Sequence, residues 1–122
     1  MDRRIVIAEG NPDGRDALER LLASWGHEVH TAGSGAEALH LVRLRDPEVL
    51  VLEMLLPDMN GWELVHRLRT EGYATFAVGY CAIRALQDHA LEAGCDAYVV
   101  KPAIEPLRTI LQSAPRRRAA SE

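Results

Sequence analysis

The fold is decided by the stretch Val49-Leu50-Val51-Leu52-Glu53-Met54-Leu55-Leu56-Pro57-Asp58-Met59-Asn60-Gly61. Residues 49–52 form an uninterrupted apolar run, which predicts a strand that is covered on both faces, as in a parallel sheet. Glu53 follows this strand directly, and Pro57 and Gly61 mark the loop behind it. The stretch therefore predicts a buried parallel strand with a carboxylate at its C-terminal end.

The rest of the chain repeats this alternation of short apolar runs with helical patterns. Asn11 and Pro12 are a typical helix cap and first-turn proline, and Ser34 with Glu37 has the spacing of a capping box. Alternating strands and helices build a parallel sheet through right-handed crossovers. The prediction is an α/β fold, a doubly wound five-stranded parallel sheet of order 2-1-3-4-5 with five helices. The expected strands are 5–8, 28–32, 49–52, 75–80 and 97–100, and the expected helices are 12–25, 35–46, 62–71, 83–93 and 105–113.

Length and charge set the broad class of protein. The 122 residues fit one domain at 1–114, and the remainder, 115–122, is expected to be a disordered basic tail that contains Arg116, Arg117 and Arg118. A net charge of −4 argues against a nucleic-acid partner. No apolar run is long enough to cross a bilayer, and the chain starts with charged residues that lead into a strand instead of a signal peptide. We therefore expect a cytoplasmic protein without membrane contact.

In a doubly wound sheet, functional sites lie at the carboxyl ends of the strands, near the switch point. The residues expected there are Glu9 and Gly10 after the first strand, Glu53 after the third, 80–82 after the fourth and Lys101 after the fifth. We therefore expect two acids and a lysine to meet at this edge.

These residues resemble the phosphoacceptor site of bacterial response-regulator receiver domains. That family carries an aspartate where Glu53 stands, with a proline four residues on and a glycine eight residues on, the spacing of Pro57 and Gly61. The resemblance covers residues 4–113 and implies the flavodoxin-like receiver fold. It also includes Asn11-Pro12, the run 93–97, Tyr98 at the position of the family's switching aromatic, and Lys101-Pro102, whose peptide bond is typically cis in the family.

The resemblance further implies a set of groups for phosphoryl transfer. The family has two acids after strand one, the acceptor aspartate, a threonine or serine after strand four, and the lysine, and a magnesium ion offsets the repulsion between anions. Three of these positions differ here. Glu53 replaces the aspartate, Gly10 replaces the second acid, and the hydroxyl is replaced by Cys81 in the strand-based alignment or by Gly79 in an ungapped one. In either alignment the hydroxyl is missing.

These departures predict an atypical receiver that acts as a phosphorylation-independent signalling and protein-interaction module. We expect no catalytic residue, no enzymatic activity and no cofactor, because a magnesium ion would find only Glu9, Glu53 and the Leu55 carbonyl. Two alternatives stay open: a small-molecule-sensing pseudo-receiver that uses the vestigial pocket, and a receiver that is still weakly phosphorylated. A flavoprotein enzyme is disfavoured, since the first strand lacks a Gly/Ser/Thr-rich phosphate loop behind it.

Glu53 itself has two interpretations. Its carboxylate reaches about 1.5 Å further than that of an aspartate, so it could act as a partial mimic of the phosphorylated state. Alternatively, it forms an ion pair with Lys101 and holds one conformation. We favour the ion pair, because one carboxylate supplies one charge where a phosphoryl group supplies nearly two. The sequence leaves open whether the resulting state is active-like or inactive-like.

The resemblance places the partner surface on the fourth helix, fifth strand and fifth helix. Receivers dimerise there or bind another protein, so we expect a homodimer or a partner that is a histidine kinase-related or effector protein. The candidate residues on this surface are Tyr98, Arg84, Gln87, Asp88 and Arg108.

The cysteines and histidines follow no metal-site spacing. Cys81 and Cys95 are expected to be free, buried thiols. The histidines at 27, 30, 40, 66 and 89 fall on different elements, and we expect them to act as ordinary side chains.

Overall fold

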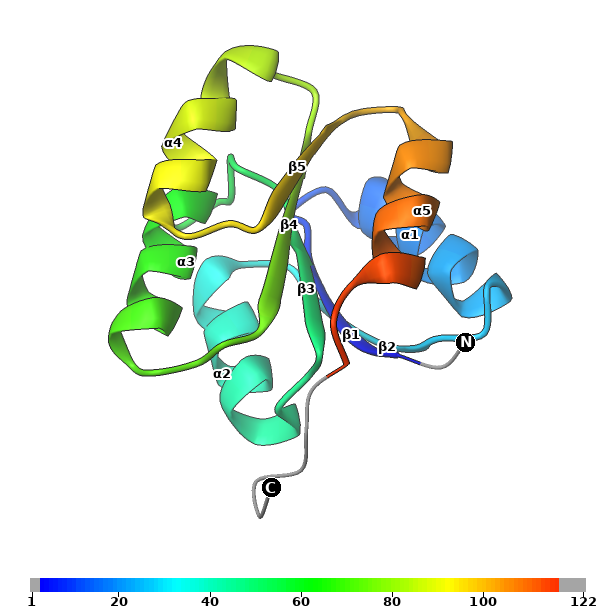
Figure 1. Ribbon diagram of the computed structural model, residues 1–122, viewed down its shortest axis with the longest axis horizontal. Coiled ribbons are helices and arrows are strands. Elements are labelled where there is room, and N and C mark those ends of the chain that lie inside the picture. Colours follow the sequence, from blue (N-terminus) through cyan, green and yellow to red (C-terminus); the bar gives the residue numbers. More distant parts are fainter. Residues whose placement is uncertain (1–2, 117–122) are drawn as a thin grey trace.

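The computed structural model describes residues 3–116, which contain one five-stranded parallel sheet of order β2-β1-β3-β4-β5 (Figure 1). The strands are β1 Arg4–Ala8, β2 Glu28–Ala32, β3 Val49–Leu52, β4 Phe76–Cys81 and β5 Ala97–Val100. The helices are α1 Pro12–Ser24, α2 Gly35–Arg45, α3 Gly61–Thr70, α4 Gln87–Ala93 and α5 Ile104–Ser113. The predicted architecture and strand order are confirmed.

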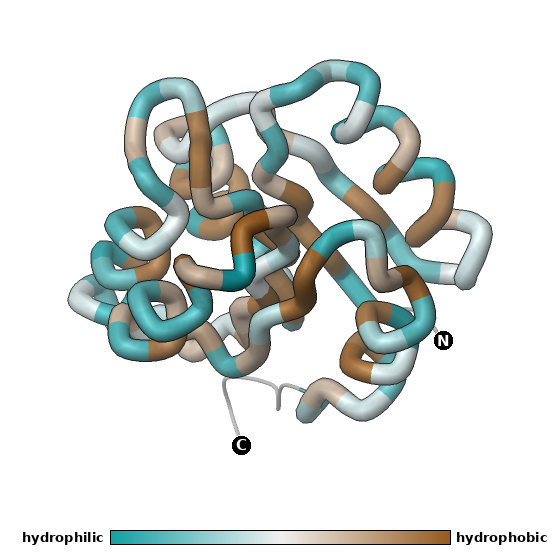
Figure 2. Tube along the Cα trace, turned by 90° about the horizontal axis from the view of Figure 1, so that it is seen from above, coloured by the Kyte–Doolittle hydropathy of each residue, from teal (hydrophilic) through white to brown (hydrophobic). Residues whose placement is uncertain are grey.

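Two layers of helices cover the sheet, with α1 and α5 on one face and α2, α3 and α4 on the other (Figure 1). Strand β3 lies between them: Leu50 and Leu52 pack towards the three-helix face, and Val49 and Val51 towards the two-helix face. All four side chains are at most 1% exposed, which confirms the prediction of a strand covered on both faces. Hydrophobic residues accordingly gather along the strands (Figure 2).

The register of the sheet brings the ends of the strands to one edge. Ala8 at the end of β1 pairs with Leu52 at the end of β3, and Cys81 at the end of β4 pairs with Val100 at the end of β5. The residues that follow these four positions therefore emerge side by side, as the topology predicts.

Side-chain caps fix the helices that begin at this edge. Asn11 accepts a hydrogen bond from the Gly14 amide at 2.9 Å, and Ser34 accepts one from the Glu37 amide at 3.1 Å. The Glu37 carboxylate reaches back to the Gly33 amide at 2.5 Å, one residue before the position that a capping box uses. The β1–α1 and β2–α2 turns are thereby held in defined positions around the edge.

The fourth helix differs from the prediction. A 3-10 turn, Arg84–Leu86, precedes α4, and Ile83, which was expected to line the helix, is extended and 40% exposed. The Tyr98 hydroxyl donates a hydrogen bond to the Ile83 carbonyl at 2.5 Å. The same carbonyl also accepts a hydrogen bond from the Leu86 amide at 3.3 Å, which is the i to i+3 bond of the 3-10 turn, and the α-helix begins only after this turn. Strand β4 also begins and ends one residue later than predicted.

Most of the predicted basic tail, including Arg117 and Arg118, lies outside the described residues. Arg116 is described, and its Nη1 lies 3.8 Å from the Glu48 Oε2 atom. The domain boundary at residue 114 stays a prediction.

Candidate functional site

Two acids and a lysine meet at the carboxyl edge of the sheet, as the sequence predicts. Lys101 Nζ lies 2.6 Å from Glu9 Oε1 and 2.9 Å from Glu53 Oε1. The three side chains are only 27%, 8% and 14% exposed, respectively. The peptide bond between Lys101 and Pro102 is cis. These residues come from the ends of β1, β3 and β5, so three strands are joined by one ion network.

The remaining carboxylate oxygens are occupied by backbone amides. Glu53 Oε2 accepts a hydrogen bond from the Met54 amide at 2.8 Å and lies 3.5 Å from the Leu55 amide. Glu9 Oε2 accepts one from the Asn11 amide at 3.1 Å. Each of the four carboxylate oxygens therefore has a hydrogen-bond donor from within the chain.

The electrostatics keep Glu53 and Lys101 charged at neutral pH. Burial alone would raise the pKa of Glu53, but hydrogen bonds from Cys81 and Lys101 outweigh it and lower the pKa below 4.5. Burial likewise opposes the charge of Lys101, but its bonds to Glu9 and Glu53 raise its pKa above 10.5. Two carboxylates face one ammonium, so the local charge is negative and does not favour the binding of an anion.

A cavity of about 390 Å³ lies beside this network. Cys81 lines it together with Glu53, whereas Gly79 pairs with Leu52 inside the sheet. Of the two alignments, the strand-based one therefore assigns the family's hydroxyl position to a residue that lines the cavity. Both Cys81 and Cys95 are free and buried, as predicted, and burial raises the pKa of Cys95 to about 12.

Gly10 lines the same cavity and is covered by Pro57. A Cβ atom added at Gly10 would lie 2.9 Å from Pro57 Cδ, closer than real side chains approach. Position 10 thus lacks an acid, and it also lacks the space for a larger side chain while the loop stays where it is.

The candidate partner surface is only partly assembled as predicted. Tyr98, Arg84 and Gln87 line one cavity of about 490 Å³ between β5, α5 and the start of α4. Burial and the neighbouring Cys81 raise the pKa of Tyr98, so its hydroxyl stays a donor. Asp88 is exposed in the first turn of α4 and does not line this cavity.

Arg108 lies elsewhere. Its guanidinium carbon is 5.2 Å from the centre of the Trp25 ring, so it faces α1. Arg108 was expected on the surface formed by α4, β5 and α5. The apolar spacing of α5 shows which residues are buried, but it does not show whether an exposed residue such as Arg108 faces α1 or that surface.

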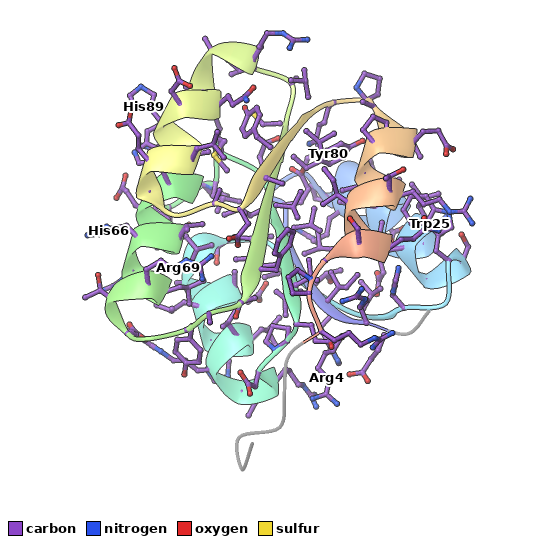
Figure 3. All side chains as sticks on the ribbon, viewed as in Figure 1. Arg4, Trp25, His66, Arg69, Tyr80 and His89 are labelled. Carbon is purple, nitrogen blue, oxygen red and sulfur yellow. The ribbon has the colours of Figure 1, made fainter. Side chains whose placement is uncertain are left out.

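One feature that the sequence did not predict is a groove of about 830 Å³ between α3 and α4. The rings of Trp62 and His89 stack across it with centroids 5.2 Å apart, and His66 lies on the same outer side (Figure 3). Trp62 and His66 have the i, i+4 spacing of one helix face, which is the only local signal of this groove. The pairing with α4 is a tertiary contact that no spacing reveals.

Metal ligands do not cluster in residues 3–116: no three His, Cys, Asp or Glu side chains there could share an ion. Over the same residues, no helix combines the length and apolar character needed to cross a membrane.

A 2-1-3-4-5 parallel sheet with acids after β1 and β3 and a Lys–cis-Pro pair after β5 defines a receiver-type signalling domain. The chain belongs to the response regulator receiver domain family, whose model matches residues 5–112.

Two of the curated relatives are bacterial transcriptional regulatory proteins. The transcriptional regulatory protein AfsQ1 of Streptomyces coelicolor is 36% identical over 103 residues, which are 80% of this chain and 44% of that protein. The probable transcriptional regulatory protein TcrX of Mycobacterium tuberculosis is 33% identical over 100 residues, 80% of this chain and 43% of that protein. The chain thus spans less than half the length of these two relatives.

Solved structures agree with this assignment. A two-component response regulator from Clostridium difficile has a TM-score of 0.85 at 26% identity, covering 94% of this chain and 97% of that one. The response regulator TrrA from Thermotoga maritima, in complex with Mg²⁺ and BeF, has a TM-score of 0.86 at 23% identity, covering 93% and 99% of the two chains. The second likeness shows the shared fold.

Proposed function

We propose that this receiver domain is a phosphorylation-independent signalling and protein-interaction module, without enzymatic activity and located in the cytoplasm. The observation that carries the proposal is the position of the Glu53 carboxylate. Its Oε1 atom takes the ammonium of Lys101 and its Oε2 atom takes the Met54 amide. A phosphoryl group needs cationic and N–H donors of this kind, and Glu53 already occupies them.

Magnesium fits this site poorly. The ion requires near-octahedral oxygen ligands and is usually held by carboxylates. Here the oxygens of Glu9 and Glu53 all accept hydrogen bonds, and Gly10 supplies no third carboxylate. Binding would require Lys101 to leave both acids. We therefore propose that the domain works without a metal cofactor.

The geometry favours the ion-pair interpretation of Glu53 over the phosphoryl mimic. The contact with Lys101 is 2.9 Å, and the second oxygen folds back onto the backbone instead of projecting outwards. Both ends of the carboxylate are therefore held in one place. This supports a site with a single resting conformation.

We propose that the ion network influences the partner surface through Cys81. This thiol interacts with both the Glu53 carboxylate and the Tyr98 hydroxyl, and Tyr98 in turn donates to the Ile83 carbonyl. Tyr98 lines the cavity at the α4–β5–α5 surface. We propose that this surface binds a histidine kinase-related or effector protein, or a second copy of the domain, and that its shape is set by the fixed site.

Phosphorylation can be tested directly by intact mass. The protein is incubated with a small phosphodonor and excess magnesium, beside a receiver domain that is known to be phosphorylated under the same conditions. We expect no gain of a phosphoryl group. A stable gain that disappears in Glu53→Gln would show a receiver that is still phosphorylated, and the proposal would then be wrong.

The cavity supports a second candidate, a small-molecule-sensing pseudo-receiver. Its volume of about 390 Å³ lies within the range of ligand pockets, and Leu55, Leu56 and Ile83 give it an apolar wall beside the charged residues. Reproducible thermal stabilisation by a compound from a metabolite panel, lost when Leu56 is replaced by Trp, would favour this function.

A further inference from the structure

Tyr80 and Cys81 are neighbours in β4, and their side chains take opposite faces of the sheet because successive strand residues alternate. Cys81 lines the cavity of about 390 Å³ beside the ion network, on the three-helix face. Tyr80 packs with the hydrophobic residues under α1 and α5, and Figure 3 shows it on the side of the sheet that these two helices cover. A second cavity, of about 200 Å³, lies there, and Tyr80 lines it. The two cavities are therefore on opposite faces of β4.

The side chain of Tyr80 brings a polar group without a partner to this second cavity. Tyr80 is only 6% exposed, and within residues 3–116 its hydroxyl shares a hydrogen bond with no other residue. Burial raises the pKa of Tyr80, so the hydroxyl stays protonated and able to donate at neutral pH. A buried hydroxyl without a partner costs free energy, and a hydrogen bond to a bound molecule removes that cost.

Lys101 supplies a second donor at the same place. Its ammonium carries three N–H donors, of which Glu9 and Glu53 take two. No oxygen acceptor for the third lies in the part of the chain that the structure describes. Lys101 lines the second cavity, and its Nζ atom lies 5.5 Å from the centre of the Tyr80 ring. Two hydrogen-bond donors, an ammonium and a phenol, thus lie at this cavity without an acceptor.

The rest of the cavity wall is mainly apolar. Ala17, Leu18 and Leu21 of α1 line it together with Ile104 of α5. Glu9 is the one acid among the lining residues, and both of its oxygens already accept hydrogen bonds. The two carboxylates around one ammonium disfavour an anionic ligand. A cavity of about 150 Å³ holds benzene, so this one fits a molecule of about six non-hydrogen atoms.

We propose that the cavity between α1 and α5 binds a small neutral molecule whose carbonyl or hydroxyl oxygen accepts hydrogen bonds from Tyr80 and Lys101. This site is separate from the cavity that Glu53 lines, and it goes beyond the proposed function. Glu9 lines both cavities, so the bound molecule lies against the ion network. Occupancy of the site therefore gives the network an input from the face of the sheet opposite to Cys81.

The probe is methyl isopropyl ketone, which joins one carbonyl oxygen to a small apolar body. Isobutyrate is its anionic counterpart, because it keeps the isopropyl and carbonyl groups and adds a charge. Each is titrated into the full chain at neutral pH, and amide chemical shifts are followed residue by residue by NMR. We expect the ketone to cause saturable shifts at residues 17, 18, 21, 80 and 104, and to bind more tightly than isobutyrate. Absence of saturable shifts, shifts spread evenly over the surface, or tighter binding of isobutyrate would overturn the proposal.

Three variants test which groups hold the probe. Tyr80→Phe removes the hydroxyl and keeps the ring, so the ketone should bind roughly fivefold more weakly, the effect of losing one hydrogen bond. Tyr73→Phe is the matched control, because Tyr73 packs against the core of the three-helix face and does not line this cavity, and the affinity should be unchanged. Ala17→Trp fills the cavity from an exposed position of α1 and should abolish the shifts.

Equal affinities of wild type and Tyr80→Phe would contradict the role of the hydroxyl. Shifts that survive in Ala17→Trp would show that the ketone binds elsewhere, and the proposal would then be wrong. None of these measurements uses a phosphodonor, so this site and the absence of phosphorylation can fail separately.

Discussion

Replacing Lys101 by methionine tests the ion network most directly. The substitution removes the ammonium that contacts Glu9 at 2.6 Å and Glu53 at 2.9 Å, and it keeps most of the apolar side-chain stem. Two carboxylates then face each other without a cation, in positions that are 8% and 14% exposed. Removing one partner of a fully buried pair costs about 3–5 kcal/mol, and exposed pairs contribute about 0–1 kcal/mol.

The network lies between these two limits, so we expect the free energy of unfolding to fall by about 2 kcal/mol. For a domain of this size, that corresponds to a melting temperature about 8 °C lower. Urea unfolding and thermal melting, both followed by circular dichroism near neutral pH, measure the loss. Arg20→Met is the matched control, because Arg20 pairs with Asp16 on the surface, where the side chains are 79% and 56% exposed, and should change stability little.

The pH dependence gives the sharper test. Because the folded-state pKa of Glu53 is lowered, its contribution is present above its ordinary pKa of 4.5 and is lost as the pH falls through the folded value. The pKa of Lys101 is raised, so its contribution is present below 10.5 and is lost only as the pH rises through the folded value. The difference in the free energy of unfolding between the wild type and Lys101→Met should therefore be constant near neutral pH. It should decrease as the pH falls below 4.5. A gap below about 0.5 kcal/mol, or one that does not narrow in acid, would refute the reasoning.

Three further predictions concern packing and reactivity. Gly35→Ala should lower the free energy of unfolding by about 1–3 kcal/mol in urea titrations, because the new methyl group overlaps Met59. His89→Ala should lower it by about 0.5–1.5 kcal/mol in the same assay, since it removes the ring that stacks on Trp62. The thiol of Cys95, with its pKa raised to about 12, should resist a disulfide reagent in the folded protein at mildly alkaline pH and react once urea unfolds the chain.

Each of these has its own control. Gly14→Ala, where the added Cβ atom meets only ordinary van der Waals contacts, should stabilise the protein by about 0.4–1 kcal/mol, and a loss equal to that of Gly35→Ala would contradict the packing argument. His40→Ala removes an exposed histidine from α2, and an equal effect there would mean that the stack contributes nothing. A Cys95→Ala variant identifies which thiol reacts, and rapid labelling that this variant abolishes would show that burial does not protect Cys95.

The parts of the fold that the sequence predicts are those with local causes. Residues 49–52 are apolar at every position, so their burial on both faces could be predicted without any knowledge of their neighbours. Asn11 and Ser34 mark helix starts through contacts within three residues. The meeting of Glu9 with Lys101, which lie 92 positions apart, followed from topology alone, because parallel strands end at a common edge.

The parts that the sequence did not predict depend on long-range contacts of single atoms. Ile83 has the apolar spacing of a helix, but its carbonyl accepts a hydrogen bond from the Tyr98 hydroxyl, and the α-helix begins only after the 3-10 turn. Asp58 has the appearance of an ordinary loop residue, and only the structure shows that it caps α2. The side of α5 on which Arg108 lies was mistaken for the same reason, since spacing gives a helical face but not its neighbour.

The contact between Pro57 and Gly10 also bears on how such a domain could change over time. The receiver family carries both a second acid after its first strand and this loop proline, so an aspartate at position 10 requires the proline ring to shift but does not require the loop to be lost. Asp58 and Met59 of the same loop contact the start of α2, so that shift would also change the contacts at the N-terminus of α2. Regaining the lost acid would therefore alter the cavity and the start of a neighbouring helix together.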